Sequence, residues 1–218
     1  MDINGPSILP INGNDPKQLV IFCHGYGADG NDLIGLANYF QQALPDAYFI
    51  SPNAPEKCHM NPMGYQWFDF SSNDPELVWN KVNEAGSILN NFIDLKLKEL
   101  NLEDKDLSLV GFSQGTMMSL HVGLRRINSL SSIVGFSGRL IREDTLKSEI
   151  KSKPPIYLIH GDQDPMVPFQ DTLNAEKILK DHNVDIQTHI SKNTQHSIAQ
   201  DGLEIAIKFL CSNFLVEK

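Results

Sequence analysis

The chain has 218 residues, with 18 Lys and Arg against 27 Asp and Glu, so its formal net charge is −9. Hydrophobic residues at 41% and charged residues at 21% indicate an ordinary globular protein, not a disordered or fibrous one. The acidic balance disfavours nucleic-acid binding and attachment to anionic lipid, since both need a basic surface. The length fits a single domain over residues 1–218.

Three widely separated cysteines, Cys23, Cys58 and Cys211, form no C-x-x-C pair and no disulfide framework, which indicates a reducing compartment. The first residues lack the basic and apolar regions of a signal peptide. No apolar run reaches the roughly 18 residues that a membrane helix needs. We therefore expect a cytoplasmic protein without stable membrane anchoring, and its oligomeric state is open, a homodimer included.

Strand-like and helix-like segments alternate along the whole chain. Short apolar runs rich in β-branched residues predict buried strands of a parallel sheet at residues 19–23, 47–50, 107–110, 132–136 and 156–159. Residues 184–190 alternate between apolar and polar side chains, which predicts a strand nearer the edge of the sheet.

Helices are expected between these strands. Asn31 can cap a helix with apolar positions from 33 to 44, and Asp74 followed by proline opens a long amphipathic stretch to residue 92. A last helix follows Ser197. The pattern predicts an α/β fold, a doubly wound and mostly parallel sheet with helices on both faces and no separate lid domain.

Residues 111–115 read Gly-Phe-Ser-Gln-Gly between a buried strand and a predicted helix, which is the nucleophile-elbow pattern. Such a turn projects the Ser113 hydroxyl above the sheet and brings the chains so close that only glycine fits at 111 and 115. The similar run Gly-Phe-Ser-Gly at 135–138 is followed by no clear helix, so we interpret its serine as a loop residue.

A serine hydroxyl is a weak nucleophile, so it needs a general base and an acid that orients the base. In proteins with a nucleophile elbow, the acid follows the serine in the chain and the histidine comes last. His196 lies in the loop between the last strand and the last helix, from where an imidazole can reach over the carboxyl ends of the strands. Structural positions on helices or strands explain the remaining downstream histidines, His121, His160, His182 and His189.

The acid is expected in the segment 160–168, which reads His-Gly-Asp-Gln-Asp-Pro-Met-Val-Pro after a buried strand. Asp164 lies further into this loop than Asp162 and is better placed to reach His196. Asp162 is the alternative, and we interpret it as a brace of the loop. The predicted triad is therefore Ser113, Asp164 and His196.

Residues 25–30 match the G-x-G-x-x-G fingerprint of dinucleotide-binding proteins. That fingerprint also needs an acidic residue at the end of the second strand, where this chain has Ser-Pro, and Asp46 lies at the wrong end. The same loop can instead build half of an oxyanion hole, with the backbone N–H groups of Tyr26 and Gln114 as donors. We favour the oxyanion hole and keep dinucleotide binding as a distant alternative.

No metal site and no cofactor are predicted. The histidines are scattered, H-E-x-x-H is absent, and the pair Cys58-His59 stands alone.

With these motifs the chain resembles the acyl-protein thioesterase, carboxylesterase and lysophospholipase family of small α/β-hydrolases. The resemblance rests on residues 24–30, 67–69, 111–115, 160–168 and His196. It implies an α/β-hydrolase that cleaves carboxylic esters or thioesters of small molecules or acylated proteins through an acyl-enzyme, with the residues named above as nucleophile, acid, base and oxyanion donors. A lysophospholipase or a lactone-opening enzyme of the same fold is the nearer alternative.

The long stretch 51–73 shows no clear period, and loops of this length are usually functional or mobile. In the family it builds the acyl groove, so we expect substrate contacts from it and from the acid loop. The expected residues are Met63, Tyr65, Trp67, Phe68 and Met166, with Met60 and Phe70 as further candidates. Burial in the core stays the alternative for most of them, and Trp67 is favoured as lining.

Overall fold

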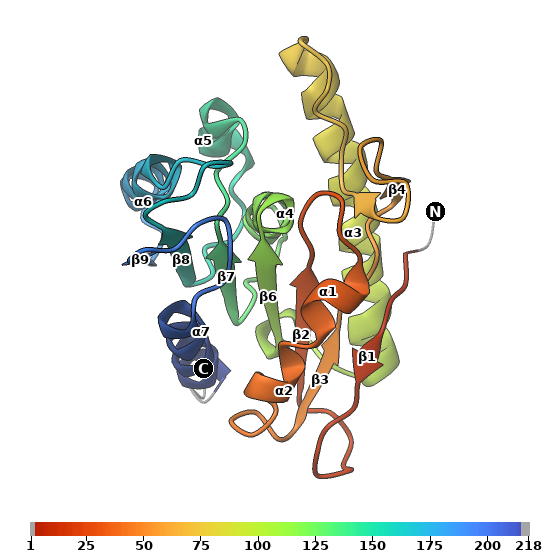
Figure 1. Ribbon diagram of the computed structural model, residues 1–218. Helices are drawn as coiled ribbons and strands as arrows, with labels where there is room; N and C mark the ends of the chain where they lie inside the picture. The colour runs from red at the N-terminus through yellow and green to blue at the C-terminus, as the bar shows by residue number, and fades with distance from the viewer. Residues whose placement is uncertain (1–2, 215–218) are drawn as a thin grey trace.

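The structure is a computed structural model, and it describes residues 3–214. A seven-stranded sheet lies at its centre in the order β1-β3-β2-β6-β7-β8-β9 (Figure 1). The strands are β1 (Ser7–Ile8), β2 (Gln18–Cys23), β3 (Ala47–Ile50), β6 (Leu107–Phe112), β7 (Ser132–Phe136), β8 (Ile156–Gly161) and β9 (Ile186–Ser191). Neighbouring strands are parallel except for β1, which pairs with β3 in the antiparallel direction.

All six predicted strands are confirmed, and β9 is an edge strand as its alternating pattern predicted. Strand β1 at the opposite edge was not predicted, because its two residues are too few to show a period.

Helices cover both faces of the sheet. They are α1 (Gly30–Ile34), α2 (Ala37–Phe40), α3 (Pro75–Leu100), α4 (Gln114–Gly123), α5 (Leu146–Glu149), α6 (Gln170–Asp181) and α7 (Gln200–Phe214), with short 3₁₀ turns at Asp104–Asp106 and Glu143–Thr145. Alternate residues of each strand face opposite sides. Leu19 and Ile21 of β2 belong to the core under α3 and α4, whereas Val20 and Phe22 belong to the core under α1, α2 and α7. The predicted doubly wound arrangement is thus confirmed.

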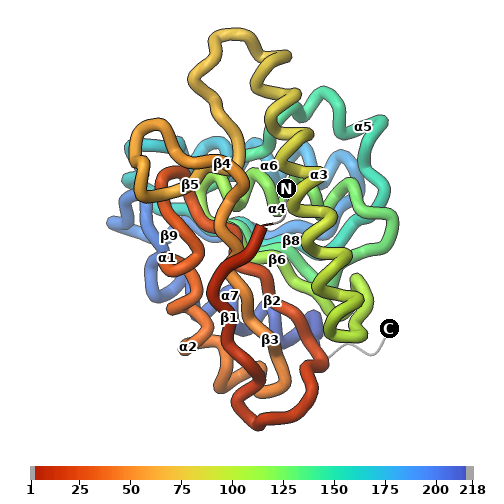
Figure 2. Tube along the Cα trace, turned by 90° about the vertical axis from the view of Figure 1, so that its right-hand side faces the viewer, coloured from red at the N-terminus to blue at the C-terminus, as the bar shows by residue number. Residues whose placement is uncertain are grey.

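The start of α3 follows the predicted cap. Asp74 accepts a hydrogen bond from the Glu76 N–H at 2.9 Å, and Pro75 occupies the first helical position, where its missing N–H is not needed. The first turns of α3 and the chain before them project beyond the rest of the fold (Figures 1 and 2). Within the preceding loop lies a small hairpin of β4 (Glu56–Lys57) and β5 (Tyr65–Gln66).

The predicted cap of the first helix is wrong by two residues. Asp29, not Asn31, has extended backbone and accepts the Asn31 N–H at 2.8 Å, so α1 begins at Gly30. The expected helix over 33–44 is also divided into two short helices, α1 and α2, which end at Ile34 and Phe40. Both Asp and Asn are good cap residues, so composition alone cannot choose between them.

The parallel strands all end at the same edge of the sheet, and the loops that follow them meet there. Figure 1 shows β6 running into α4 at this edge, beside the chain that leaves β2. No helix within residues 3–214 combines the length and the apolar character needed to cross a membrane.

Candidate active site

The turn between β6 and α4 has the strained geometry expected of a nucleophile elbow. Ser113 has φ 54° and ψ −116°, and its N–H donates to the Phe136 carbonyl oxygen at 2.8 Å. A non-glycine residue at positive φ is costly unless its surroundings hold it there. The conformation ends the strand abruptly and lets α4 begin at the next residue, Gln114.

Close backbone approach explains the two glycines that flank the elbow. A Cβ atom on Gly115 would lie 1.8 Å from the Cys23 carbonyl oxygen, and one on Gly111 would lie 2.4 Å from the Thr116 nitrogen. Neither distance leaves room for a side chain, so β2, β6 and the start of α4 can pack this closely only with glycine.

Asp164 and His196 come together although 32 residues separate them. The His196 Nδ1 lies 2.7 Å from the Asp164 Oδ2, while the Asp164 Oδ1 accepts the N–H groups of Met166 at 2.8 Å and Val167 at 2.9 Å. Burial by itself would raise the pKa of Asp164, but these hydrogen bonds outweigh it and hold that pKa below its ordinary value. The carboxylate is therefore a stable anion beside the imidazole.

His196 lies over the elbow. Its ring contacts the ring of Phe112, the residue before Ser113, with the centroids 4.8 Å apart. Because Nδ1 faces a carboxylate, it carries the proton of the neutral ring, and Nε2 is left with a lone pair. The predicted acid and base thus contact each other, and the base contacts the residue before the elbow serine. Asp162 instead accepts a long 3.4 Å hydrogen bond from the Thr194 N–H, which fits a brace of the loop.

The backbone N–H groups of Tyr26 and Gln114 are the two that the sequence analysis singled out as oxyanion donors. Gly25 lies next to the elbow, since a Cβ atom on it would be 3.4 Å from the Ser113 Cβ. Within residues 3–214 neither amide donates to another protein group. Both are therefore available to a bound oxygen at the point where β2 and β6 end.

Three other amides of the glycine loop are already used. The Gly27 N–H donates to the Tyr65 oxygen at 2.8 Å, that of Ala28 to the Gly25 oxygen at 3.2 Å, and that of Gly30 to the Asn53 side chain at 2.8 Å. A dinucleotide fingerprint needs such amides free to approach a pyrophosphate. The internal bonding of this loop therefore argues against the dinucleotide alternative.

Trp67 and Phe68 are core residues, which corrects the expectation that they line the substrate groove. They are 1% and 3% exposed, and the Trp67 indole donates to the His24 oxygen at 2.9 Å. The Gln114 side chain joins them to the elbow, accepting from the Trp67 N–H at 2.8 Å and donating to the Phe68 oxygen at 2.7 Å. This brace was not predictable from the sequence, because nothing local to Gln114 signals a contact 47 residues away.

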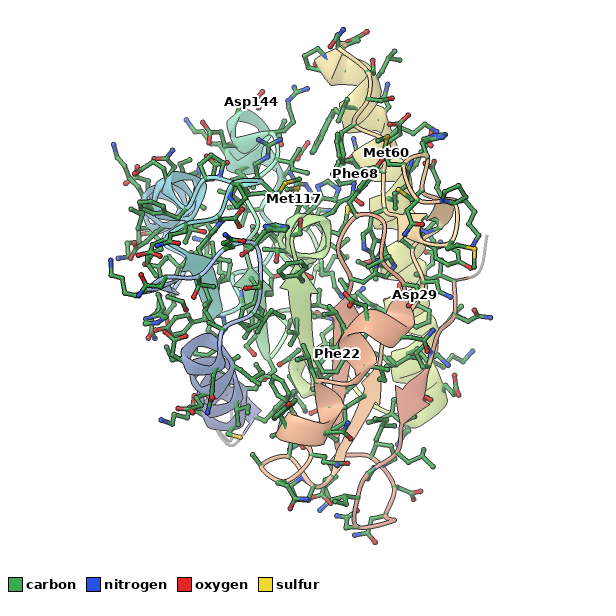
Figure 3. All side chains as sticks on the ribbon, in the orientation of Figure 1. Phe22, Asp29, Met60, Phe68, Met117 and Asp144 are labelled. Atoms are coloured by element: carbon green, nitrogen blue, oxygen red, sulfur yellow. The ribbon has the colours of Figure 1, made fainter. Side chains whose placement is uncertain are left out.

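The other expected lining residues are open to solvent to different degrees. Met63 is 83% exposed, Met166 is 72% exposed, and Met60 and Phe70 are exposed as well, while Tyr65 is half-buried under the Lys57 ammonium at 3.7 Å. In Figure 3, Met60 lies out on the loop beside β4, whereas Phe68 lies nearer Met117 of α4. Only part of the expected set is therefore accessible to a substrate.

A groove of about 500 Å³ is lined in part by the start of α3, and neither Ser113 nor His196 lines it. Two of its neighbours lead toward the elbow. A Cβ atom on Gly138, the residue before its lining residue Arg139, would lie 3.0 Å from the Ser113 carbonyl oxygen. Phe70, which lines the groove, packs against the Tyr26 ring with the centroids 4.7 Å apart. Val78, Trp79 and Leu140 give it apolar surface, and charged groups also line it, including Arg139, Arg142 and Asp171.

No group of three or more His, Cys, Asp or Glu side chains in residues 3–214 is arranged to hold a metal ion.

The sheet order, the strained turn after β6 and the loops that meet above it define an α/β-hydrolase fold. Residues 9–213 match the profile of the phospholipase/carboxylesterase family, and the chain belongs to this family. Membership implies a carboxylic ester hydrolase.

Individual relatives agree with this assignment. The chain is 32% identical over 212 residues to acyl-protein thioesterase 1 of Saccharomyces cerevisiae, covering 89% of this chain and 92% of that protein. It is 26% identical over 197 residues to esterase YpfH of Escherichia coli, covering 89% and 82%. Among solved structures, the crystal structure of esterase PE8 is 40% identical, has a TM-score of 0.92 and covers 97% of this chain and 99% of its own.

Proposed function

We propose that the protein is a serine hydrolase that cleaves carboxylic esters or thioesters through an acyl-enzyme on Ser113. The observation that carries this proposal is the strained elbow serine together with a histidine that contacts the preceding residue, Phe112, and whose Nδ1 lies 2.7 Å from a buried carboxylate. Names of relatives that include both thioesterases and esterases support the substrate class.

In this proposal His196 Nε2 removes the Ser113 proton while the hydroxyl oxygen attacks the acyl carbonyl carbon. Asp164 keeps the imidazole oriented and stabilises its positive charge. The negative oxygen of the tetrahedral intermediate accepts the N–H groups of Tyr26 and Gln114. His196 then protonates the leaving alcohol or thiol, and water activated by the same residue releases the acid.

The braced segment 67–68 has an indirect role in the proposed site. Because the Gln114 side chain is bonded to this segment, the Gln114 N–H is held in one direction before a substrate arrives. A donor fixed in advance stabilises the developing oxyanion without a cost of reorganisation. The groove that Phe70 lines is the proposed place for the acyl group, and the exposed Met166 on the acid loop is a further proposed apolar contact outside that lining.

Ser113→Ala tests the proposal. We expect it to abolish hydrolysis of a short p-nitrophenyl ester and covalent labelling by a fluorophosphonate probe. The matched control is Ser137→Ala, because Ser137 follows the neighbouring strand in a similar Gly-Phe-Ser-Gly run and is buried, and its hydroxyl has no hydrogen-bond partner among residues 3–214. Labelling that survives in the first variant and disappears in the second would refute Ser113 as the nucleophile.

A substrate panel separates the remaining alternatives within the family. Matched acyl esters, acyl thioesters, lysophospholipids and lactones across chain length are compared by kcat/KM. We expect esters and thioesters to be the better substrates. A lactone or lysophospholipid preferred by an order of magnitude or more would replace the proposed substrate class while leaving the serine mechanism intact.

A further inference from the structure

His160 is a buried histidine beside the proposed triad that the mechanism above does not use. It lies in β8, four residues before Asp164, and is 1% exposed. Its Nδ1 is 2.7 Å from the Thr172 Oγ1, and its Nε2 is 2.9 Å from the Val167 oxygen and 3.2 Å from the Asp164 Oδ2. Both ring nitrogens therefore have close polar partners.

These partners decide which nitrogen carries the proton. A carbonyl oxygen and a carboxylate oxygen lie near Nε2, and both are acceptors, so Nε2 must be the donor. Nδ1 of the neutral ring then has a lone pair, which the Thr172 hydroxyl satisfies by donating its hydrogen. Thr172 is 1% exposed in the first turn of α6, so bulk water does not replace it. The Nε2–H tautomer of His160 thus fits its partners on both sides, and Thr172 holds the ring at Nδ1.

The selected tautomer bears on Asp164 in two ways. Val167 accepts the His160 hydrogen bond with its carbonyl and donates its own N–H to the Asp164 Oδ1 at 2.9 Å. In addition, the positive N–H edge of His160 faces the Asp164 Oδ2, the same oxygen that pairs with His196. One ring therefore holds the loop around the carboxylate and also stabilises its charge.

We propose that His160 and Thr172 are positioning residues that keep Asp164 an oriented anion for His196. The proposal rests on the triad proposed above. The titratable groups that face Asp164 are His160 and His196. The charged pairs next to them are Asp162 with Lys192 at 3.6 Å and Asp171 with Arg139 at 4.0 Å.

Thr172→Val tests the placement of the ring, since valine keeps the shape and lacks the hydroxyl. Without the donor at Nδ1 the ring is held on one side only, so its Nε2–H no longer stays directed at the Val167 oxygen and the Asp164 carboxylate. A carboxylate that loses this donor is more basic and holds the proton on His196 more strongly. We expect kcat to fall about tenfold, as for loss of one hydrogen bond to a charged group, with KM unchanged and the acidic limb of the pH–rate profile at higher pH.

Thr172→Ser restores the hydroxyl and should bring kcat and the acidic limb back toward wild type. The control for loss of a buried hydroxyl is Ser108→Ala, which removes a 2.8 Å contact with Ser132 near the amino end of β6, away from the site. It should change thermal stability but leave the acidic limb in place. An acidic limb that does not move in Thr172→Val, or that moves equally in Ser108→Ala, would overturn the proposal.

Imidazole ¹⁵N spectra supply a readout that needs no turnover. The His160 Nε2–H signal should indicate a hydrogen-bonded proton in the wild type and in Thr172→Ser, and a weaker hydrogen bond of that proton in Thr172→Val. An unchanged Nε2–H signal in all three proteins would refute the role of Thr172. Fluorophosphonate labelling of Ser113 tests the proposed function separately, so a failure of the serine mechanism is distinguished from a failure of this inference.

Discussion

His121 should make the protein less stable as the pH falls below neutrality. Its ring is buried between α3 and α4, edge-on to the Trp79 ring at a centroid distance of 5.2 Å, and its Nδ1 has no hydrogen-bond partner among the described residues. Gly86 makes the space, since a Cβ atom there would lie 2.8 Å from the imidazole. Burial, assisted by the positive charge of Arg125, lowers the pKa of His121 from 6.5 to about 3.

The direction of this change in stability follows from the number of protons that the folded and unfolded states bind. As the pH falls from 6.5 toward 3, the unfolded chain takes up a proton at His121 and the folded chain does not, so folding stability decreases across this window. Between pH 7 and pH 5 the loss amounts to about 2 kcal/mol. A substitution that removes the ionisable group should remove this loss.

We therefore expect His121→Leu to gain about 2 kcal/mol relative to wild type between pH 7 and pH 5, whatever its stability at pH 7. Urea unfolding at both pH values measures the free energy of unfolding of each protein. His59→Gln, on the exposed loop, controls for loss of a histidine elsewhere. Stability curves of wild type and His121→Leu that run parallel from pH 7 to pH 5 would refute the reasoning.

Two further substitutions test the acid of the site and a buried charge. Asp164→Asn should lower kcat about ten-thousand-fold, because an amide cannot orient the histidine base as a carboxylate does. Asp162→Asn still offers an oxygen to the Thr194 N–H and should keep most activity. If steady-state kinetics gave the reverse ranking, the roles assigned to Asp162 and Asp164 would be exchanged. Arg126→Met leaves the Asp104 carboxylate, 2.5 Å from the guanidinium and largely buried, without its partner. We expect urea denaturation to report a loss of about 3 kcal/mol, and an unchanged midpoint would contradict a stabilising pair.

Regular local patterns made much of the fold predictable. The apolar runs of the strands and the cap at Asp74 with its following proline report contacts within a few residues, so a short window of sequence contains the information. The same holds for the elbow, because the glycines on both sides of Ser113 are needed where the neighbouring backbone leaves no room for a Cβ atom. The order of acid and histidine after that serine narrowed the candidates to Asp164 and His196, which the fold brings within hydrogen-bond distance.

Burial of the loop side chains was not predictable in the same way. Trp67 and Phe68 have the composition of a greasy groove, but they lie in the core because Gln114 and the His24 oxygen hold their segment against the elbow. Whether an aromatic side chain lines a groove or fills a core depends on what packs over it, and that partner is distant in the chain.

By itself, the sequence determined the succession of strands and helices, the elbow at Ser113 and the family to which the chain belongs. Only the tertiary structure decided which groups surround the acid. The contacts of His160 with Thr172 and Val167, like that of His196 with Asp164, join separate elements at the carboxyl edge of the sheet. Local sequence reflects propensity and period, whereas the direction of a buried hydrogen bond is determined by the three-dimensional arrangement of its donors and acceptors.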